Sequence, residues 1–305
     1  MHVKWVRVKE ETWEKLMLLK IAKRYRSLDE AIEALLSAQL EPREELERKH
    51  ASLLRAKRVL EDLLSCSSRK MFTIVNRTWN PVTGCTHLCR YCWARGLTAK
   101  LRNGSRYGEG FAPKLVEEEL RATFKPGEVV FVCDMGDLFC EGVPVKWIRK
   151  VLERTRKFPE TRFLFLTKNP ARYAGFLDFF PQNSVLGATI ETNRDELYRE
   201  HGISRAPLPS ERYRAMRDLK WDKKFVSVEP ILDFDLEEFA KWIADILPFM
   251  VYVGYDNYGN RLPEPPLRKT LELVERLSEH TLVVRKTLRP AWFETLERFA
   301  GGEGG

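Results

Sequence analysis

Short apolar stretches alternate with amphipathic ones through most of the chain, and this alternation constrains the fold more than any other feature. Strands are expected at 72–79, 128–133, 161–166, 185–190, 225–228, 249–254 and 282–285. Helices are expected between them, at 91–101, 145–157, from Asn169-Pro170 onward, 195–200, 211–219, 235–246 and 266–278. Because alternating strands and helices form parallel sheets joined by crossover connections, the sequence predicts an α/β fold with a parallel sheet.

The composition indicates a cytoplasmic protein with a substantial core. The chain has 305 residues and is 44% hydrophobic, but no apolar run approaches the ~18–20 residues that span a bilayer. The N-terminus lacks the apolar segment of a signal peptide, so we expect no membrane partner. In the cytoplasm the 6 cysteines are expected to be ligands or core thiols rather than disulfides.

Charge is abundant and slightly positive. Charged residues make up 31% of the chain, a composition typical of thermophile proteins. The net charge of +8 is compatible with a DNA or RNA partner.

The first 70 residues read as two segments that precede the α/β part. Residues 1–42 contain an expected strand and two helices, which is too little chain for an independent core. This order resembles the ribbon–helix–helix module, which implies a homodimer through residues 1–40 with Trp5, Arg7 and Lys9 facing nucleic acid. A dimerisation clip without any nucleic-acid role fits the same residues. Residues 43–70 are expected to form a helical spacer and linker, and 71–305 the α/β domain.

Three cysteines stand close together, at Cys85, Cys89 and Cys92. Thiolates are soft ligands that suit iron–sulfur clusters and zinc. Three of them can hold three irons of a [4Fe–4S] cube and leave the fourth iron open to bind a small molecule. A zinc knot with His87 as the fourth ligand is a second reading, although its spacing is not that of the usual zinc finger. An electron-transfer cluster is a third, and it needs a fourth cysteine.

The C-x3-C-x2-C spacing, with Tyr91 directly before the last cysteine, resembles the cluster motif of the radical S-adenosylmethionine superfamily. The resemblance implies a partial (β/α)6 barrel with a [4Fe–4S] cluster on Cys85, Cys89 and Cys92. It also implies S-adenosyl-L-methionine as the cofactor, with Tyr91 near its adenine, and a ferredoxin- or flavodoxin-like electron donor. In that family the reduced cluster cleaves the cofactor to methionine and a 5′-deoxyadenosyl radical.

Polar residues follow several of the expected strands, where barrels of this type carry their active sites. In the family, a Gly-Gly-Glu-like segment that binds the methionine amino group follows the second strand. Here that segment reads Met-Gly-Asp, so the resemblance assigns this role to Gly136 and Asp137. It assigns the ribose hydroxyls to the residues after the fourth strand, Thr189, Glu191 and Asn193.

Three further residues are candidates for catalysis. Lys168, after the third strand, can hold a carboxylate or phosphate, or it can be a solvated helix-start residue. Glu229, after the fifth, places a carboxylate near the core, where it needs a hydrogen-bond partner or a ligand, so it is also a candidate for cofactor binding. Tyr255, after the sixth, lines a pocket or belongs to a turn.

Two other cysteines, Cys133 and Cys140, can be read as ligands of a second cluster. They lack the clustered spacing of the first three cysteines, which favours a core strand thiol and a loop thiol instead.

Four stretches, at 78–85, 135–139, 166–168 and 227–230, together look like one branch of the radical S-adenosylmethionine superfamily. That branch also occurs in phages and lies near spore photoproduct lyase, a DNA-repair enzyme. The expected function is therefore reductive cleavage of S-adenosylmethionine and hydrogen abstraction from an unidentified substrate, with nucleic acid modification or repair as one option. The alternative is a non-enzymatic DNA-binding regulator whose metal is structural or senses redox state.

Overall fold

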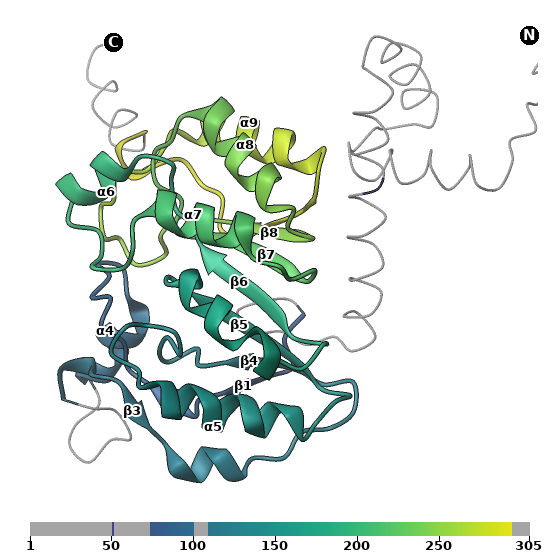
Figure 1. Ribbon diagram of the computed structural model, residues 1–305. Coiled ribbons are helices and arrows are strands. Elements are labelled where there is room, and N and C mark those ends of the chain that lie inside the picture. The colour runs from purple at the N-terminus through teal and green to yellow at the C-terminus, as the bar shows by residue number, and fades with distance from the viewer. Residues whose placement is uncertain (1–50, 52–73, 101–108, 295–305) are drawn as a thin grey trace, which may run out of the picture.

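The computed structural model describes residue 51, residues 74–100 and residues 109–294 (Figure 1). The predicted ribbon–helix–helix-like module, with Trp5, Arg7 and Lys9, lies outside these residues, and so does the spacer apart from residue 51. The domain boundaries 1–42, 43–70 and 71–305 therefore stay predictions.

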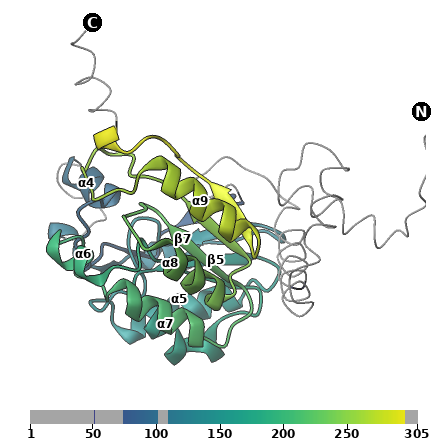
Figure 2. The ribbon, with the colours of Figure 1, turned by 90° about the horizontal axis from the view of Figure 1, so that it is seen from above.

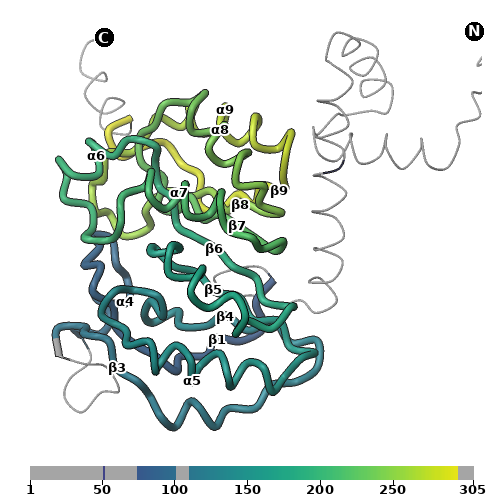
Figure 3. The backbone as a smooth tube through the Cα atoms, in the orientation of Figure 1, coloured from purple at the N-terminus to yellow at the C-terminus, as the bar shows by residue number. Residues whose placement is uncertain are grey.

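Seven parallel strands form the main sheet, which confirms the α/β fold and is consistent with a partial barrel. The strands pair in chain order from one edge to the other (Figure 3). They are β1 (Arg77–Trp79), β4 (Val129–Val132), β5 (Arg162–Thr167), β6 (Val185–Thr189), β7 (Lys224–Val228), β8 (Met250–Val253) and β9 (Leu282–Arg285). Because all strands are parallel, their carboxyl ends meet at one edge of the sheet.

Helices form a layer over the sheet in the same order as the strands (Figures 1 and 2). The packed neighbours are α5 (Val145–Arg156), η4 (Pro170–Phe179), α7 (Pro209–Asp218), α8 (Leu236–Ile246) and α9 (Leu267–Ser278). Two shorter helices, α4 (Trp93–Lys100) and α6 (Asp195–Glu200), lie near the carboxyl ends of the strands (Figure 1). Among the described helices, none combines the length and apolar character needed to cross a membrane.

Alternate residues of the strands face two different cores, as the two-residue period of a strand requires. On β4, Val130 and Val132 pack into the core beneath the helices, whereas Val129 and Phe131 belong to a separate inner core. At the carboxyl ends of β5 and β6, the polar residues Thr167, Lys168 and Thr189 line a cavity together with Phe131 and Leu166 of the inner core. Those ends are therefore where a site can form.

Several details differ from the sequence-based expectation. Of the described residues of the strand expected at 72–79, which begin at 74, only 77–79 form β1, and the element after Asn169 is the 3-10 helix η4. Asp235, where a helix was expected to begin, precedes α8, and its carboxylate binds Arg194.

Four short elements carry too few residues for a periodic signal and were missed. They are β2 (Val82–Thr83), β3 (Lys114–Leu115), η2 (Glu109–Phe111) and η3 (Glu117–Arg121).

Two glycines bring the cysteine loop against the end of β4. Gly84, at φ +80°, forms an isolated parallel bridge with Gly136, and its N–H donates to the carbonyl of Met135 at 2.9 Å. A Cβ atom at Gly136 would lie 2.7 Å from the Gly84 carbonyl oxygen. Only glycine allows this approach, which sets the position of Cys85, the next residue.

Gly136→Ala should therefore lower the free energy of unfolding by about 1–3 kcal/mol, because backbone atoms on both sides must move apart. Urea unfolding of the metal-free protein measures this. Gly96→Ala is the matched control, since its Cβ would meet nothing within 4 Å inside α4. That substitution should leave stability unchanged or raise it by up to ~1 kcal/mol. Equal stabilities for both variants would contradict the steric argument.

Candidate functional site

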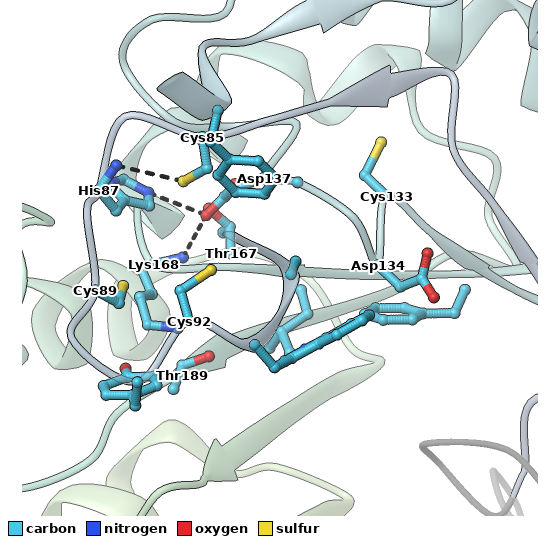
Figure 4. A pocket seen from close by; sticks show the side chains of 17 residues that line it. Cys85, His87, Cys89, Cys92, Cys133, Asp134, Asp137, Thr167, Lys168 and Thr189 are labelled. Atoms are coloured by element: carbon cyan, nitrogen blue, oxygen red, sulfur yellow. Dashed lines mark hydrogen bonds and ion pairs between the residues drawn. The ribbon is translucent and has the colours of Figure 1, made fainter. Parts of the chain in front are cut away.

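The three clustered thiols line one cavity at the carboxyl ends of the strands (Figure 4). The cavity has a volume of about 140 Å³, and the cysteine loop, the loop after β4 and the ends of β5 and β6 form its walls. Cys89 is 6% exposed, while Cys85 and Cys92 are half-buried. The folded chain thus brings the three predicted cluster ligands, Cys85, Cys89 and Cys92, into one pocket.

The outer side of the cysteine loop is held by the segment that precedes α7. The carbonyl of His87 accepts hydrogen bonds from the Arg205 N–H at 2.6 Å and the Ser204 hydroxyl at 2.9 Å. The Cys89 Sγ lies 3.2 Å from the same hydroxyl, and the Arg90 N–H donates to the carbonyl of Ile203 at 2.9 Å. Residues more than 110 positions away thus determine the conformation of the loop.

Asp137 joins three segments around the cavity through its buried carboxylate. Oδ2 lies 3.0 Å from the His87 Nε2 and accepts the Lys168 N–H at 2.9 Å. Oδ1 accepts the Thr167 hydroxyl at 2.7 Å and the Phe139 N–H at 2.9 Å. Burial alone would raise the pKa of Asp137, but the hydrogen bonds and charge from His87, with those from Lys168 and Thr167, lower it to about 2.

The donor set suits a cluster held by three thiolates. Cys133 also lines the cavity, but its sulfur lies apart from the other three (Figure 4), and Cys140 is fully buried against Cys85 rather than lining the cavity. Burial raises the pKa of Cys89, and the contact with Cys140 together with burial raises that of Cys85. Metal binding at these thiols must therefore release protons.

A second metal arrangement is also present. Ligand atoms of Cys85, His87 and Asp137 all lie within 4.8 Å of one another. This set uses only one of the three clustered thiols, and it includes the His87 position of the zinc reading.

A larger cavity of about 400 Å³ opens beside the first. The two cavities share the wall residues Tyr91, Trp93, Leu166, Lys168 and Thr189.

Two of the predicted catalytic candidates, Glu229 and Tyr255, line the larger cavity. Glu229 accepts a hydrogen bond from the Lys286 Nζ at 2.6 Å. The Tyr255 hydroxyl lies 3.0 Å from the Pro265 carbonyl and 2.7 Å from the Thr270 hydroxyl, and burial raises the pKa of Tyr255 to about 12.

Lys168 and Thr189 face both cavities, and Gly136 lines the smaller one. The Lys168 ammonium lies 5.2 Å from the centre of the Tyr91 ring, a cation–π distance. Burial opposes its charge, but the thiol of Cys89 and the carboxylate of Glu191 raise its pKa. Lys168 is thus a positive charge between the thiols and the larger cavity.

Glu191 and Asn193 lie outside both cavities. The Glu191 carboxylate is fully buried and binds the Arg212 guanidinium at 2.6 Å and the Tyr91 hydroxyl. The Asn193 side chain binds Glu238 and the N–H of Asp235. The sequence analysis did not single out Arg212, because a charged residue in a charged helix normally faces solvent.

A family model described as "Protein of unknown function (DUF5131)" matches residues 70–244. No curated protein matches the chain.

Solved structures of spore photoproduct lyase resemble the fold at low identity. A mutant form has a TM-score of 0.46 at 14% identity, over 71% of this chain and 64% of that one. A mutant with bound AdoMet and dinucleoside spore photoproduct has a TM-score of 0.44 at 13% identity, over 67% and 61% of the two chains. The chain thus covers less than two thirds of the length of these structures.

The lowered pKa of Asp137 predicts that the free energy of unfolding depends on pH in the acid range. The charged form is favoured in the folded state, so its contribution is present above about pH 4 and is lost as the pH falls toward 2. The shift corresponds to about 2 kcal/mol. The parent protein should lose this contribution to its free energy of unfolding between pH 5 and pH 2.5, as measured by urea unfolding. Asp137→Asn has no carboxylate to protonate, so its free energy of unfolding should fall less over the same range. The exposed Asp178→Asn is the control, and a profile of Asp137→Asn parallel to that control would contradict the assignment.

Proposed function

This chain belongs to the DUF5131 family, and we propose that it is a radical S-adenosylmethionine enzyme. The observation that carries the proposal is the cavity formed around Cys85, Cys89 and Cys92. These three thiols have the spacing of that superfamily's cluster motif, and they face a cavity rather than solvent. The cavity lies at the carboxyl ends of parallel strands, where barrel enzymes of this type hold their sites.

The three thiolates would hold a [4Fe–4S] cluster with one open iron. With S-adenosyl-L-methionine, such a group would supply a 5′-deoxyadenosyl radical once an external ferredoxin- or flavodoxin-like donor provides an electron. The chain itself binds and orients. Tyr91 and Thr189 would offer a ring and a hydroxyl to the adenosine, and Gly136 and Asp137 would lie near the methionine part.

The larger cavity is the proposed substrate pocket. It lies beside the thiol cavity and is lined by Glu229, Lys286 and Tyr255. The Glu229–Lys286 pair offers both a donor and an acceptor, which suits a substrate with polar edges such as a nucleobase. Lys168, at the junction of the two cavities, suits a carboxylate or phosphate. Nucleic acid is therefore the proposed substrate class, with modification or repair as the proposed reaction.

A second function has its own supporting observation. The Cys85, His87 and Asp137 ligand atoms lie close enough to hold a single metal ion. A structural or redox-sensing metal there would fit a non-enzymatic DNA-binding regulator. Metal content and cofactor cleavage separate the two functions.

After anaerobic reconstitution, the protein should bind about four irons and four sulfides per chain. With dithionite it should cleave S-adenosylmethionine to 5′-deoxyadenosine, measured by liquid chromatography and mass spectrometry. Ala at Cys85, Cys89 or Cys92 should abolish both results, because each removes a ligand. Cys133→Ala is the matched control, since that thiol lines the same cavity apart from the motif and should leave the iron content intact.

Stoichiometric zinc without iron, lost on His87→Ala, would instead support the regulator. Iron binding without cofactor cleavage would overturn the enzyme proposal and leave a redox-sensing cluster.

We also propose that the N-terminal module pairs two chains through residues 1–40 and presents Trp5, Arg7 and Lys9 to nucleic acid. Its expected apolar strand face cannot be buried by forty residues alone, so a second copy should cover it. Arg7 from both chains would then face phosphates or guanine edges.

Deletion of residues 1–64 should convert a dimer to a monomer, measured by light scattering. It should also remove an affinity for DNA or RNA that falls with added salt, since phosphate neutralisation releases counterions. Arg7→Glu in the full chain should remove the affinity and keep the dimer. A truncated chain that stays dimeric would show that the main interface lies elsewhere.

A further inference from the structure

We infer that Glu191 and Arg212 are positioning residues that hold Tyr91 in place, and that Glu191 does not contact the cofactor itself. This inference rests on the proposed function for its effect on cofactor affinity. The coupling between Tyr91, Glu191 and Arg212 rests on the described contacts alone. We call Tyr91, Glu191 and Arg212 the buried strut.

Both oxygens of the Glu191 carboxylate are used inside the protein. Oε1 accepts the Tyr91 hydroxyl, and Oε2 accepts Arg212 Nη1 at 2.6 Å. The side chains of Glu191 and Arg212 are 0% exposed. A carboxylate in this state has no free face toward either cavity, so a ribose hydroxyl cannot reach it without breaking the strut.

Arg212 is anchored on all sides, which makes it a rigid support. Its Nε donates to the Pro207 carbonyl at 2.6 Å, and its Nη1 donates to the Thr189 carbonyl at 2.9 Å as well as to Glu191. Its Nη2 donates to the Tyr198 hydroxyl. Burial opposes the charge, but Glu191, Tyr198 and Tyr91 raise the pKa of Arg212, so it stays positive.

The buried strut ends at the cysteine loop. Tyr91 stands between Cys89 and Cys92, and its ring lines both cavities. The hydroxyl end of the ring is tied to Glu191, and the Lys168 ammonium lies near its face. These two contacts hold the ring where it forms part of the wall of both cavities.

Stability alone does not account for the buried ion pair between Glu191 and Arg212. A buried ion pair is costly to desolvate, and apolar residues of similar size often stabilise a fold as well or better. The pair joins α7 to the segment after β6, however, and the Tyr91 hydroxyl on the same carboxylate ties both to the cysteine loop. We therefore assign its role to the arrangement of the site.

A double-mutant cycle tests this assignment. Tyr91→Phe keeps the ring and removes the hydroxyl, and Glu191→Gln keeps the shape and removes the charge. Each single variant should raise the dissociation constant for S-adenosylmethionine about tenfold, and the double variant should be no weaker than either single one. Calorimetry on anaerobically reconstituted protein, with iron and sulfide content unchanged, is the measurement.

Tyr198→Phe is the matched control for this cycle. It removes a hydroxyl of the same kind from Arg212, but Tyr198 lines neither cavity. It should lower thermal stability and leave the affinity unchanged. If Glu191→Gln weakens binding while Tyr91→Phe does not, or if the two effects add, Glu191 contacts the cofactor directly and the inference is wrong.

The same cycle on the cofactor-free chain keeps the two proposals separate. There the losses of unfolding free energy for Tyr91→Phe and Glu191→Gln should be non-additive, because Tyr91→Phe removes the same hydrogen bond that loss of the Glu191 charge weakens. A parent chain that binds no S-adenosylmethionine would overturn the proposed function, and non-additive losses would still support the buried strut. Additive losses would overturn the inference whatever the cofactor result.

Discussion

The arrangement of the site depends on one buried carboxylate, that of Asp137. A charge away from water must be matched by donors, and here His87 of the cysteine loop and Thr167 and Lys168 at the end of β5 supply them. These groups come from segments far apart in the chain. Satisfying this charge therefore brings the cysteine loop and the sheet edge together, and the thiol cavity forms between them.

A second carboxylate, Glu191, plays a comparable part on the other side of the cavity. Both carboxylates are saturated by protein donors, whereas Lys168 and Thr189 face open space. Polar residues at the strand ends thus divide into those that support the walls and those that a bound molecule can reach. Under the proposed function, Lys168 and Thr189 are the more accessible contacts for the cofactor, and Glu229 belongs to the neighbouring cavity.

The fold could be predicted from the sequence because its signals are local. Alternating apolar and amphipathic stretches predicted the parallel sheet, and the cysteine spacing directed attention to the loop that forms the cavity. The partners of Asp137 and Glu191 could not be predicted, because a hydrogen bond across tens of residues leaves no periodic trace. Arg212 shows this most clearly, since its helical segment is rich in charge and gives no sign of a fully buried guanidinium.

The relative sizes of the two cavities bear on how such a site can work. The space beside the thiols is about 140 Å³, and the neighbouring one about 400 Å³. Tyr91 and Lys168 stand in the walls of both, so a molecule at the thiols and one in the larger cavity would share these two side chains as contacts. The buried strut holds the Tyr91 ring, and the ring makes a cation–π contact with the Lys168 ammonium. The wall that the two cavities share therefore has a defined shape before anything binds. A preorganised wall of this kind would orient two bound molecules toward each other, and its side chains would lose little further conformational entropy on binding.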